Sequence, residues 1–462
     1  MQIVQVLLHW CRRLTLRKRG AVLTALLLPV IVYAAVLIYT AHRLLPAAPS
    51  RTHRTHRTQR EHRPYVLSAD GRSLYEEGQA TEIASTQICL ERRNMVFLKV
   101  MKCATSTLLG LFNRFAYKRN LSVALPPGKQ IYHNWPYPMT RRDVRPTGRG
   151  EYNMILHHAV YTPAVMRALM PPDAVYISIV REPFSQLQSA FRYFNVAEIS
   201  GVPASARDPL LEYFGDVEQY EKVYMSPAAK SRWCIPDGFS VTRNLMSHCH
   251  GMPLGFPPGT RDITRDAAAT DAYIRQLGRS FELVMVAEYL FESLVLLRRL
   301  MCWRLQDIVF VSSNVAPKTG KERAAYPRHL LEFHKRWSHA DYRLYDYFNA
   351  TLWRLVARQG PGFSREVKAF KAVQSRVEQY CAALYFGDGH AKTNNTIRVP
   401  PLVEAASEWT RSFTITAEDC WALGPDPFYL TNKMKEESDT RDEKILRESS
   451  KLLDERQHKG LC

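Results

Sequence analysis

The sequence lacks several signatures that define large classes of nucleotide- and metal-dependent proteins. Its 462 residues contain no Gly-Lys-Ser/Thr triplet, no Asp-x-Asp triplet and no Cys-x-x-Cys pair. The first absence disfavours a Walker-type nucleotide kinase, the second a metal-dependent glycosyltransferase, and the third a zinc module. No set of His, Cys, Asp or Glu residues has the spacing of metal ligands, so we expect no metal.

Acidic residues are few relative to basic ones. The chain has 63 Lys and Arg against 44 Asp and Glu, a formal net charge of +19, and most of the excess is spread along the chain. A basic zipper and paired RNA-binding aromatics are both missing, so we expect no nucleic-acid partner. The charge alone leaves an anionic small molecule, a membrane surface or a merely solvated basic surface open.

Long apolar runs are also rare, with one exception near the N-terminus. Residues Ala21 to Ala41 form 21 residues without a charge, enough to cross a hydrocarbon layer of about 30 Å as a helix. We therefore predict a cytoplasmic tail (1–20), a transmembrane signal anchor (21–41) and a stem (42–91). A cleaved signal peptide and a buried core helix are the competing interpretations. The stem repeat RTHRTHRTQR is typical of a spacer, but it also suits anionic lipid or polysaccharide.

Features after the apolar run favour a lumenal body. Asn-x-Ser/Thr sequons begin at Asn120, Asn349 and Asn394, and eight of the nine cysteines follow the run. Both are typical of the secretory pathway, where glycosylation and disulfides form. The cysteines that could pair are Cys89, Cys234, Cys249, Cys302, Cys381 and Cys420, and the sequence does not fix the pairing.

The body alternates short apolar runs with helical periodicity. Four runs read as strands, namely Asn94 to Val100, Ala174 to Val180, Phe281 to Ala287 and Asp307 to Ser312. The first three are each followed by apolar residues at helical spacing. Alternating strands and helices predict an α/β domain (92–386), with a mainly parallel sheet flanked by helices and a ligand site at the strand carboxyl ends.

The C-terminal part is more helical and then more charged. Residues 327–386, including His339 to Leu355, have helical spacing, and beyond Gly387 the pattern becomes loop-like. We assign residues 387–462 to a C-terminal extension with a charged tail. Met434 to Leu453 reads as a solvated helix or a tail, without chemistry.

The first candidate anion site joins a strand to a helix. Lys99-Val-Met-Lys102-Cys-Ala-Thr105-Ser106-Thr107 places two lysines and three hydroxyls at a helix N-terminus. Backbone amides there point at an anion, and the helix dipole favours it. The sequence therefore predicts a phosphate or sulfate site, although the hydroxyls could instead simply cap the helix.

The second candidate anion site follows the next strand. Arg181 ends that strand, and Ser189 lies about two helical turns further on. A guanidinium can hold a phosphate as a fork, and a hydroxyl can add a donor. Alternatively, Arg181 pairs with a carboxylate and Ser189 has no role.

A candidate base lies between these two segments. His157 and His158 follow Tyr152 to Leu156, a probable strand. Histidine can accept a hydroxyl proton near neutral pH, and we predict His158 as that base. Metal ligation and a purely structural histidine are the alternatives.

Together these segments resemble the galactose-3-O-sulfotransferase family. The resemblance rests on VFLKxxKxAxST, the histidine pair, VYISIVREPFSQLQSAFRYF and FELVMVAEYLFESLVLLRRLMCWRLQDIVF, and it covers residues 94–370. It implies a P-loop-like sulfotransferase fold, a single-pass type II Golgi membrane protein and a galactose sulfated at its 3-hydroxyl in a glycolipid or glycan. The sulfate donor would be 3'-phosphoadenosine 5'-phosphosulfate (PAPS).

The resemblance also implies roles for individual residues. Lys102, Thr105, Ser106 and Thr107 would hold the donor's 5'-phosphosulfate, while Arg181 and Ser189 would hold its 3'-phosphate. As a separate hypothesis, we predict that His158 acts as the general base and that Lys102 stabilises the charge on the departing phosphate.

The loop departs from the family's Lys-Thr-His-Lys-Thr-Ala-Ser-Ser-Thr at Val100, Met101, Cys103 and Thr105, which puts acceptor choice or rate in doubt. Cys103 could be a reactive thiol or a small apolar filler. A Golgi glycosyltransferase and a non-catalytic sulfotransferase-like binding protein are the alternative functions.

Overall fold

The structure is a computed structural model that describes residues 89–147, 151–227, 232, 234–312, 326–386, 400–424, 426 and 428–439. The predicted tail, membrane anchor and nearly all of the stem lie outside these residues, as does Asn394. Within the described ranges, no helix has the length and apolar character needed to cross a bilayer.

A parallel five-stranded sheet forms the centre of the described body. Its strands are β1 (Met95–Leu98), β2 (Val123–Ala124), β3 (Met154–Ile155), β4 (Val175–Val180) and β5 (Leu283–Val286), in the order β2-β3-β1-β4-β5. Every neighbouring pair in this sheet is parallel. Nearly all strand residues are buried, because helices cover both faces of such a sheet. The predicted α/β class is confirmed.

The order of the strands reverses between β1 and β4. From β1 the chain runs through β2 and β3 on one side, and then crosses to β4 on the other side of β1. Leu98 near the end of β1 pairs in register with Ser178 of β4. The segments that follow these two strands therefore leave the same edge of the sheet side by side, where ligands bind in open α/β folds.

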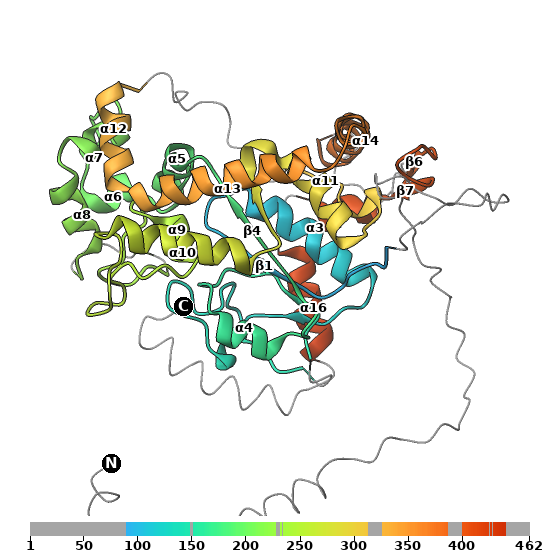
Figure 1. Cartoon of the computed structure of the whole chain (residues 1–462), viewed down its shortest axis with the longest axis horizontal. Helices are drawn as coiled ribbons and strands as arrows, with labels where there is room; N and C mark the ends of the chain where they lie inside the picture. Colours follow the sequence, from blue (N-terminus) through green and yellow to red (C-terminus); the bar gives the residue numbers. More distant parts are fainter. Residues whose placement is uncertain are drawn as a thin grey trace, which may run out of the picture. The chain divides into compact units, whose positions relative to one another are not determined.

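Helices surround the sheet and extend from it (Figure 1). Their bounds are α3 Thr105–Lys118, α4 Pro163–Leu169, α5 Pro183–Tyr193, α6 Val196–Ser200, α7 Pro209–Gly215, α8 Val217–Met225, α9 Leu245–Cys249, α10 Ala267–Ser280, α11 Leu290–Met301, α12 Arg328–Trp337, α13 His339–Ala357, α14 Gly362–Phe386, α15 Ala417–Leu423 and α16 Tyr429–Asp439. Helices α11 and α13 pack on β5 and on each other, while α15 and α16 pack on α3.

The predicted strand at Asp307 to Ser312 is wrong. A 3-10 turn covers Leu305–Asp307, and residues 308–312, the last ones described before a gap, form no strand. Instead, the side-chain amide of Gln374 on α14 accepts from Phe310 N at 3.1 Å and donates to Phe310 O at 2.6 Å. One glutamine thus satisfies the backbone groups that a neighbouring strand would pair, so the run is buried without joining the sheet.

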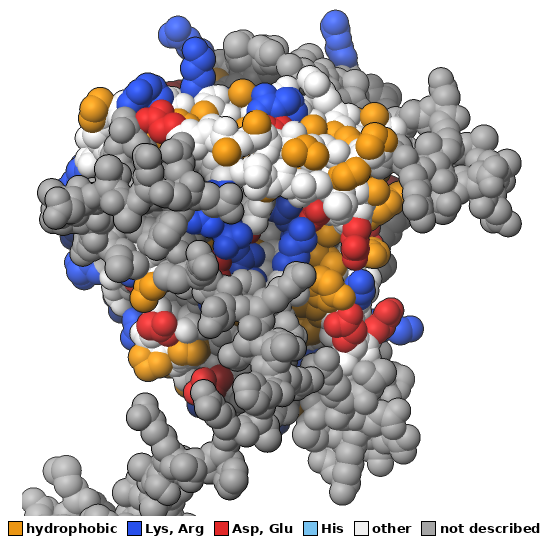
Figure 2. Space-filling model, turned by 90° about the vertical axis from the view of Figure 1, so that its right-hand side faces the viewer, with side chains coloured by type: hydrophobic (Ala, Val, Ile, Leu, Met, Phe, Trp, Pro, Cys, Tyr) orange, Lys and Arg blue, Asp and Glu red, His pale blue; other side chains and the backbone are white. Residues whose placement is uncertain are grey.

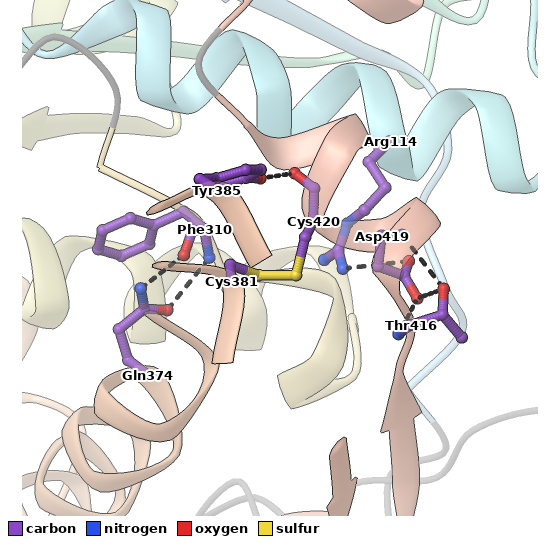
Figure 3. Close-up of a disulfide and its surroundings, with 8 residues drawn as sticks. All are labelled: Arg114, Phe310, Gln374, Cys381, Tyr385, Thr416, Asp419 and Cys420. Atoms are coloured by element: carbon purple, nitrogen blue, oxygen red, sulfur yellow. Dashed lines mark hydrogen bonds and ion pairs between the residues drawn. A yellow bond between two sulfur atoms is a disulfide. The ribbon is translucent and has the colours of Figure 1, made fainter. Parts of the chain in front are cut away.

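Two disulfides with both cysteines among the described residues tie distant parts of the body together, and Cys234 is also disulfide-bonded. Cys89 pairs with Cys302, and Cys381 pairs with Cys420 (Figure 3). Cys249, another candidate, is a free buried thiol. Next to the second disulfide, the Asp419 carboxylate accepts from Thr416 at the start of α15 and forms an ion pair with Arg114 of α3. The C-terminal segment is therefore joined to the body by covalent and polar contacts.

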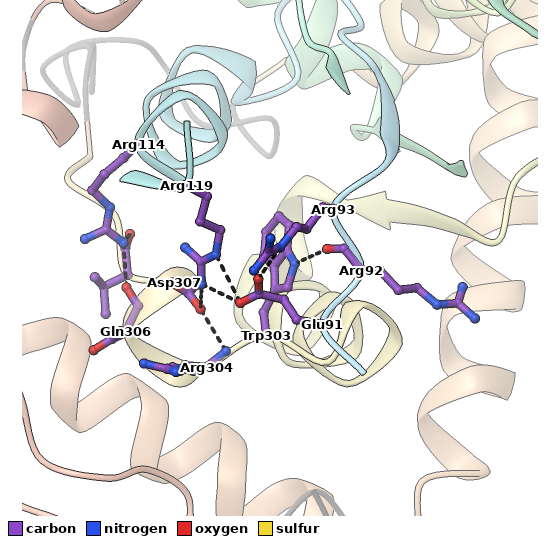
Figure 4. Close-up of polar contacts among 10 residues, drawn as sticks. Glu91, Arg92, Arg93, Arg114, Arg119, Trp303, Arg304, Gln306 and Asp307 are labelled. Carbon is purple, nitrogen blue, oxygen red and sulfur yellow. Dashed lines mark hydrogen bonds and ion pairs between the residues drawn. The ribbon is translucent and has the colours of Figure 1, made fainter. Parts of the chain in front are cut away.

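A polar cluster fixes the chain just before β1 (Figure 4). The Arg119 guanidinium donates to Glu91 at 2.7 Å and to Asp307 at 2.9 Å. The Trp303 indole donates to the carbonyl of Arg92 at 2.9 Å. The start of the domain is thereby held against the end of α3 and the segment after α11.

Residues 400–439 belong to this body. Strands β6 (Leu402–Glu404) and β7 (Phe413–Ile415) form an antiparallel pair, and α15 and α16 follow. Their described part contradicts the loop-like interpretation. Helix α16 overlaps the predicted segment Met434 to Leu453 at residues 434–439, where Lys435 is buried, and residues 440–453 lie outside the described residues.

Candidate active site

The loop after β1 forms a turn that ends in an uncapped helix. Lys102 and Ala104 have φ values of 62° and 57°, a left-handed conformation that is uncommon for residues with a side chain. Helix α3 begins at Thr105 without a side-chain cap, because its N-cap residue Ala104 has no polar side chain. The Thr105 hydroxyl donates to Val100 O at 3.1 Å. The first amides of α3 therefore remain available to an anion, and Ser106 and Thr107 beside them are only half-buried.

The two predicted anion sites meet at this loop. Arg181 directly follows β4, and its guanidinium donates to the carbonyl of Lys102 at 3.1 Å. The side chain of Gln186 on α5 also donates to the loop, at Met101 O and 3.2 Å. The sequence predicted Arg181 but not Gln186, whose partner is 85 residues away along the chain. Ser189 is half-buried further along α5.

Lys102 lies against an aromatic ring rather than a carboxylate. Its ammonium is 3.8 Å from the centroid of Tyr193, a ring at the end of α5 that is 50% exposed. Burial, followed by the charge of Arg181, lowers the pKa of Lys102 to about 8. Removal from water and a neighbouring cation both disfavour the ammonium, so a bound anion would stabilise the charge on Lys102.

His158 is held in one tautomer beside the same loop. Its Nδ1 lies 2.7 Å from the carbonyl oxygen of Lys99. A carbonyl can only accept, so Nδ1 carries the proton and Nε2 keeps its lone pair. Burial, and then the charge of Lys99, lower the pKa of His158 well below its usual value. Among the described residues Nε2 has no hydrogen-bond partner, so it can receive a proton.

Two tyrosines lie between Lys102 and His158. Tyr132 contacts the His158 ring edge-on, with centroids 5.4 Å apart, and its hydroxyl interacts with that of Tyr193. The predicted catalytic lysine and the predicted base are therefore linked by contacts through Tyr193 and Tyr132. No motif marked Tyr132, since its role depends on a bridge to His158 across 26 residues of chain.

His157 and Lys99 contact the C-terminal segment of the described body. His157 Nε2 is 3.2 Å from the hydroxyl of Thr431 on α16. The Lys99 side chain is 2% exposed, and its ammonium lies 5.4 Å from the ring of Phe428. Burial and the charge of Lys102 lower the pKa of Lys99 to about 7. Of the histidine pair, only His158 is therefore suited to accept an acceptor's proton.

The remaining predicted residues have simpler surroundings. Cys103 is buried, its thiol points to Met101 O, and burial raises its pKa well above the usual value, which fits a small filler rather than a reactive thiol. Asn120 is exposed after α3, while Asn349 is half-buried within α13. Use of either sequon stays a prediction.

The loop after β1 is surrounded by basic groups, Lys102 and Arg181 among them. Figure 2 shows Lys and Arg side chains gathered near the middle of one face of the molecule. Within the part of the chain that the structure describes, no three His, Cys, Asp or Glu residues converge. The cavities bounded by residues 207–216 and by Phe239, Phe256 and Trp337 contain none of the predicted residues.

Comparison with known proteins gives one consistent result. The family model of galactose-3-O-sulfotransferase matches residues 11–406. The chain is 34% identical over 322 residues to pig galactose-3-O-sulfotransferase 2, covering 66% of this chain and 71% of the relative. It is 34% identical to mouse galactose-3-O-sulfotransferase 3 (64% and 63%) and 31% identical to human galactosylceramide sulfotransferase (66% and 66%). The chain thus spans about two thirds of the length of these relatives.

Proposed function

Because the chain belongs to the galactose-3-O-sulfotransferase family, we propose that it transfers a sulfuryl group from PAPS to the 3-hydroxyl of a galactose. The observation that carries this proposal is the contact between Arg181 and Lys102 at the ends of β4 and β1. It joins a guanidinium, a lysine and a helix N-terminus in one place, and PAPS has two anionic ends to be held.

The residues present fit such a donor. The uncapped amides of Thr105, Ser106 and Thr107, together with Lys102, would hold the 5'-phosphosulfate. Arg181 would hold the 3'-phosphate as a fork, with Ser189 as a second donor. Each end is then recognised by groups from a different strand end, which predicts that both phosphates contribute to affinity.

The transfer step follows from the positions of two side chains. The galactose oxygen attacks sulfur in line, so that a sulfur–oxygen bond to the sugar forms while the bond to the donor's phosphate breaks. Nε2 of His158 takes the proton of the sugar hydroxyl. Lys102 stabilises the negative charge that grows on the departing phosphate. No metal is needed for this step.

The acceptor class and the location are part of the same proposal. Named relatives act on galactose and on galactosylceramide, so a galactose-ended glycolipid or glycan is the expected acceptor. The apolar run at Ala21 to Ala41, the sequons and the two disulfides support a single-pass type II protein of the Golgi membrane with a lumenal enzyme body.

An acceptor panel tests this function. The full chain is incubated with ³⁵S-labelled PAPS and, separately, galactosylceramide, a galactose-ended glycan and a glucose-ended glycan, followed by linkage analysis. We expect label on the galactose 3-hydroxyl. Donor binding without transfer to any galactoside would instead identify a binding protein. Transfer of galactose from UDP-galactose by the same sample would identify the rival glycosyltransferase.

A further inference from the structure

The C-terminal segment contacts two residues that are next to the candidate base His158. We call Phe428 together with α16 (Tyr429–Asp439) the C-terminal clamp. It lies beyond residue 406, where the family match ends, yet it contacts both Lys99 and His157. Both residues lie next to the candidate base. His157 precedes His158 in the chain, and the Lys99 carbonyl accepts a hydrogen bond from His158 Nδ1.

The clamp is held in place by several independent bonds. The Lys435 ammonium donates to the carbonyls of Gly128 and Gln130, at 3.0 and 2.7 Å. In return, the Arg145 guanidinium donates to Lys435 O at 2.9 Å and to the Ser438 hydroxyl at 2.8 Å. Lys435 is itself buried. Such bonds fix the position of Phe428 and Thr431 relative to the sheet.

Phe428 covers a lysine that has no anion beside it. The Lys99 ammonium lies over the Phe428 ring, and among the described residues it forms no ion pair or hydrogen bond. The titratable groups that act on it are Lys102 of its own loop and His157 and His158 after β3. All three are neutral or positive, and together with burial they disfavour an ammonium at Lys99. The face of the Phe428 ring attracts an ammonium, but this attraction is smaller than the cost of removing Lys99 from water, because the pKa is lowered in its presence.

We propose that the clamp completes the reaction centre, with Phe428 as a positioning residue that seals Lys99 from water behind His158. This inference rests on the proposed function. When His158 takes the acceptor's proton it becomes positive, and an ammonium close to it would oppose that change. A sealed Lys99 that has lost its proton removes this opposition.

The inference fixes the sign of a pH effect. Burial lowers the pKa of Lys99 to about 7, so activity rises as pH increases through about 7 and Lys99 becomes neutral. Water admitted by loss of the ring would raise that pKa toward its usual value of about 10.4. The acid limb of the kcat profile would then move to higher pH.

Three variants of the full chain test this. Phe428→Ala opens the seal, Phe428→Leu keeps an apolar cover, and Trp353→Ala removes an exposed ring on α13, outside the clamp. We expect Phe428→Ala to move the acid limb up by at least about one pH unit and to lower kcat at pH 7 at least about fivefold, with the donor KM within twofold. Phe428→Leu and Trp353→Ala should keep the wild-type profile.

A purely structural role gives a different result. If Phe428→Ala lowers thermal stability or kcat while the acid limb stays in place, the inference is wrong. In a Lys99→Met background, where no ammonium remains, Phe428→Ala should have no further effect on the profile. A further shift in that background would also overturn it.

The titration of Lys99 can be measured without turnover. The full chain with ¹³C-labelled lysine is titrated by NMR, and the Lys99 signal is identified by its loss in Lys99→Met. We expect a midpoint near 7 that rises in Phe428→Ala. A midpoint near 10.4 in the wild type, or no change in the variant, contradicts the inference, whereas absent sulfate transfer with the expected titration contradicts only the proposed function.

Discussion

The strand-end loops and the C-terminal segment serve the same site but differ in how they are specified. The loops after β1 and β4 contain motifs of adjacent residues, and each places its groups by local chain geometry. Residues 400–439 act through contacts with partners hundreds of residues away, such as Asn113 with Thr431, 318 residues apart. The binding groups of the site are therefore placed by short sequence motifs, whereas the C-terminal residues that pack behind them are placed by tertiary contacts.

The largest effect should follow from removing the candidate base His158, which lies with the strand-end loops. His158→Ala should lower kcat about 10²–10⁴-fold, the usual contribution of a general base, while PAPS binding stays unchanged. His329→Ala, an exposed histidine on α12, is the control. Transfer at a normal rate by His158→Ala would assign the proton transfer to another group.

Removing the loop lysine should have a slightly smaller effect. Lys102→Ala should lower kcat about 10²–10³-fold, because a group that stabilises developing charge is lost. Far-UV circular dichroism should show that the fold is retained. Lys368→Ala removes an exposed lysine on α14 and should leave transfer intact; equal losses in both variants would mean that Lys102 has no special role.

Loss of the Cys381–Cys420 bridge tests the C-terminal side. The double variant Cys381→Ser and Cys420→Ser should lower the free energy of unfolding by about 2–4 kcal/mol, because the bridge restricts the unfolded chain. Urea unfolding followed by circular dichroism measures this. An unchanged midpoint would show that segment 400–439 is held by its packing alone.

The smallest effect concerns the glutamine that replaces a strand. Gln374→Ala should lower the free energy of unfolding by about 1–3 kcal/mol, since Phe310 N and O lose their partner. Gln379→Ala, which removes an exposed amide on the same helix that donates to the Ser375 hydroxyl, should cost less. Equal costs for the two variants would argue that the backbone of Phe310 finds other partners.

Much of the fold could be predicted because buried parallel strands appear as continuous apolar runs. Met95–Leu98, Val175–Val180 and Leu283–Val286 lie within the predicted runs. The strand at Asp307 to Ser312 had the same composition, but Gln374 on a distant helix took the place of its partner. Val123–Ala124 is too short to leave a pattern.

The candidate site divides in the same way. Lys102 and Arg181 follow strands and were predicted from that position, and the structure brings them together. Gln186, Tyr132, Tyr193 and Phe428 were missed, because each matters only through a residue that the fold brings to it. Ser189 and the sequons remain predictions.

One binding measurement tests the central claim that Lys102 and Arg181 hold opposite ends of one nucleotide. Calorimetry compares 3'-phosphoadenosine 5'-phosphate with 5'-AMP, which lacks the 3'-phosphate, on the wild type and on Arg181→Ala. The wild type should bind the bisphosphate at least about tenfold more tightly, a difference of about 1.4 kcal/mol, and Arg181→Ala should bind both alike. An undiminished preference in Arg181→Ala would contradict the account.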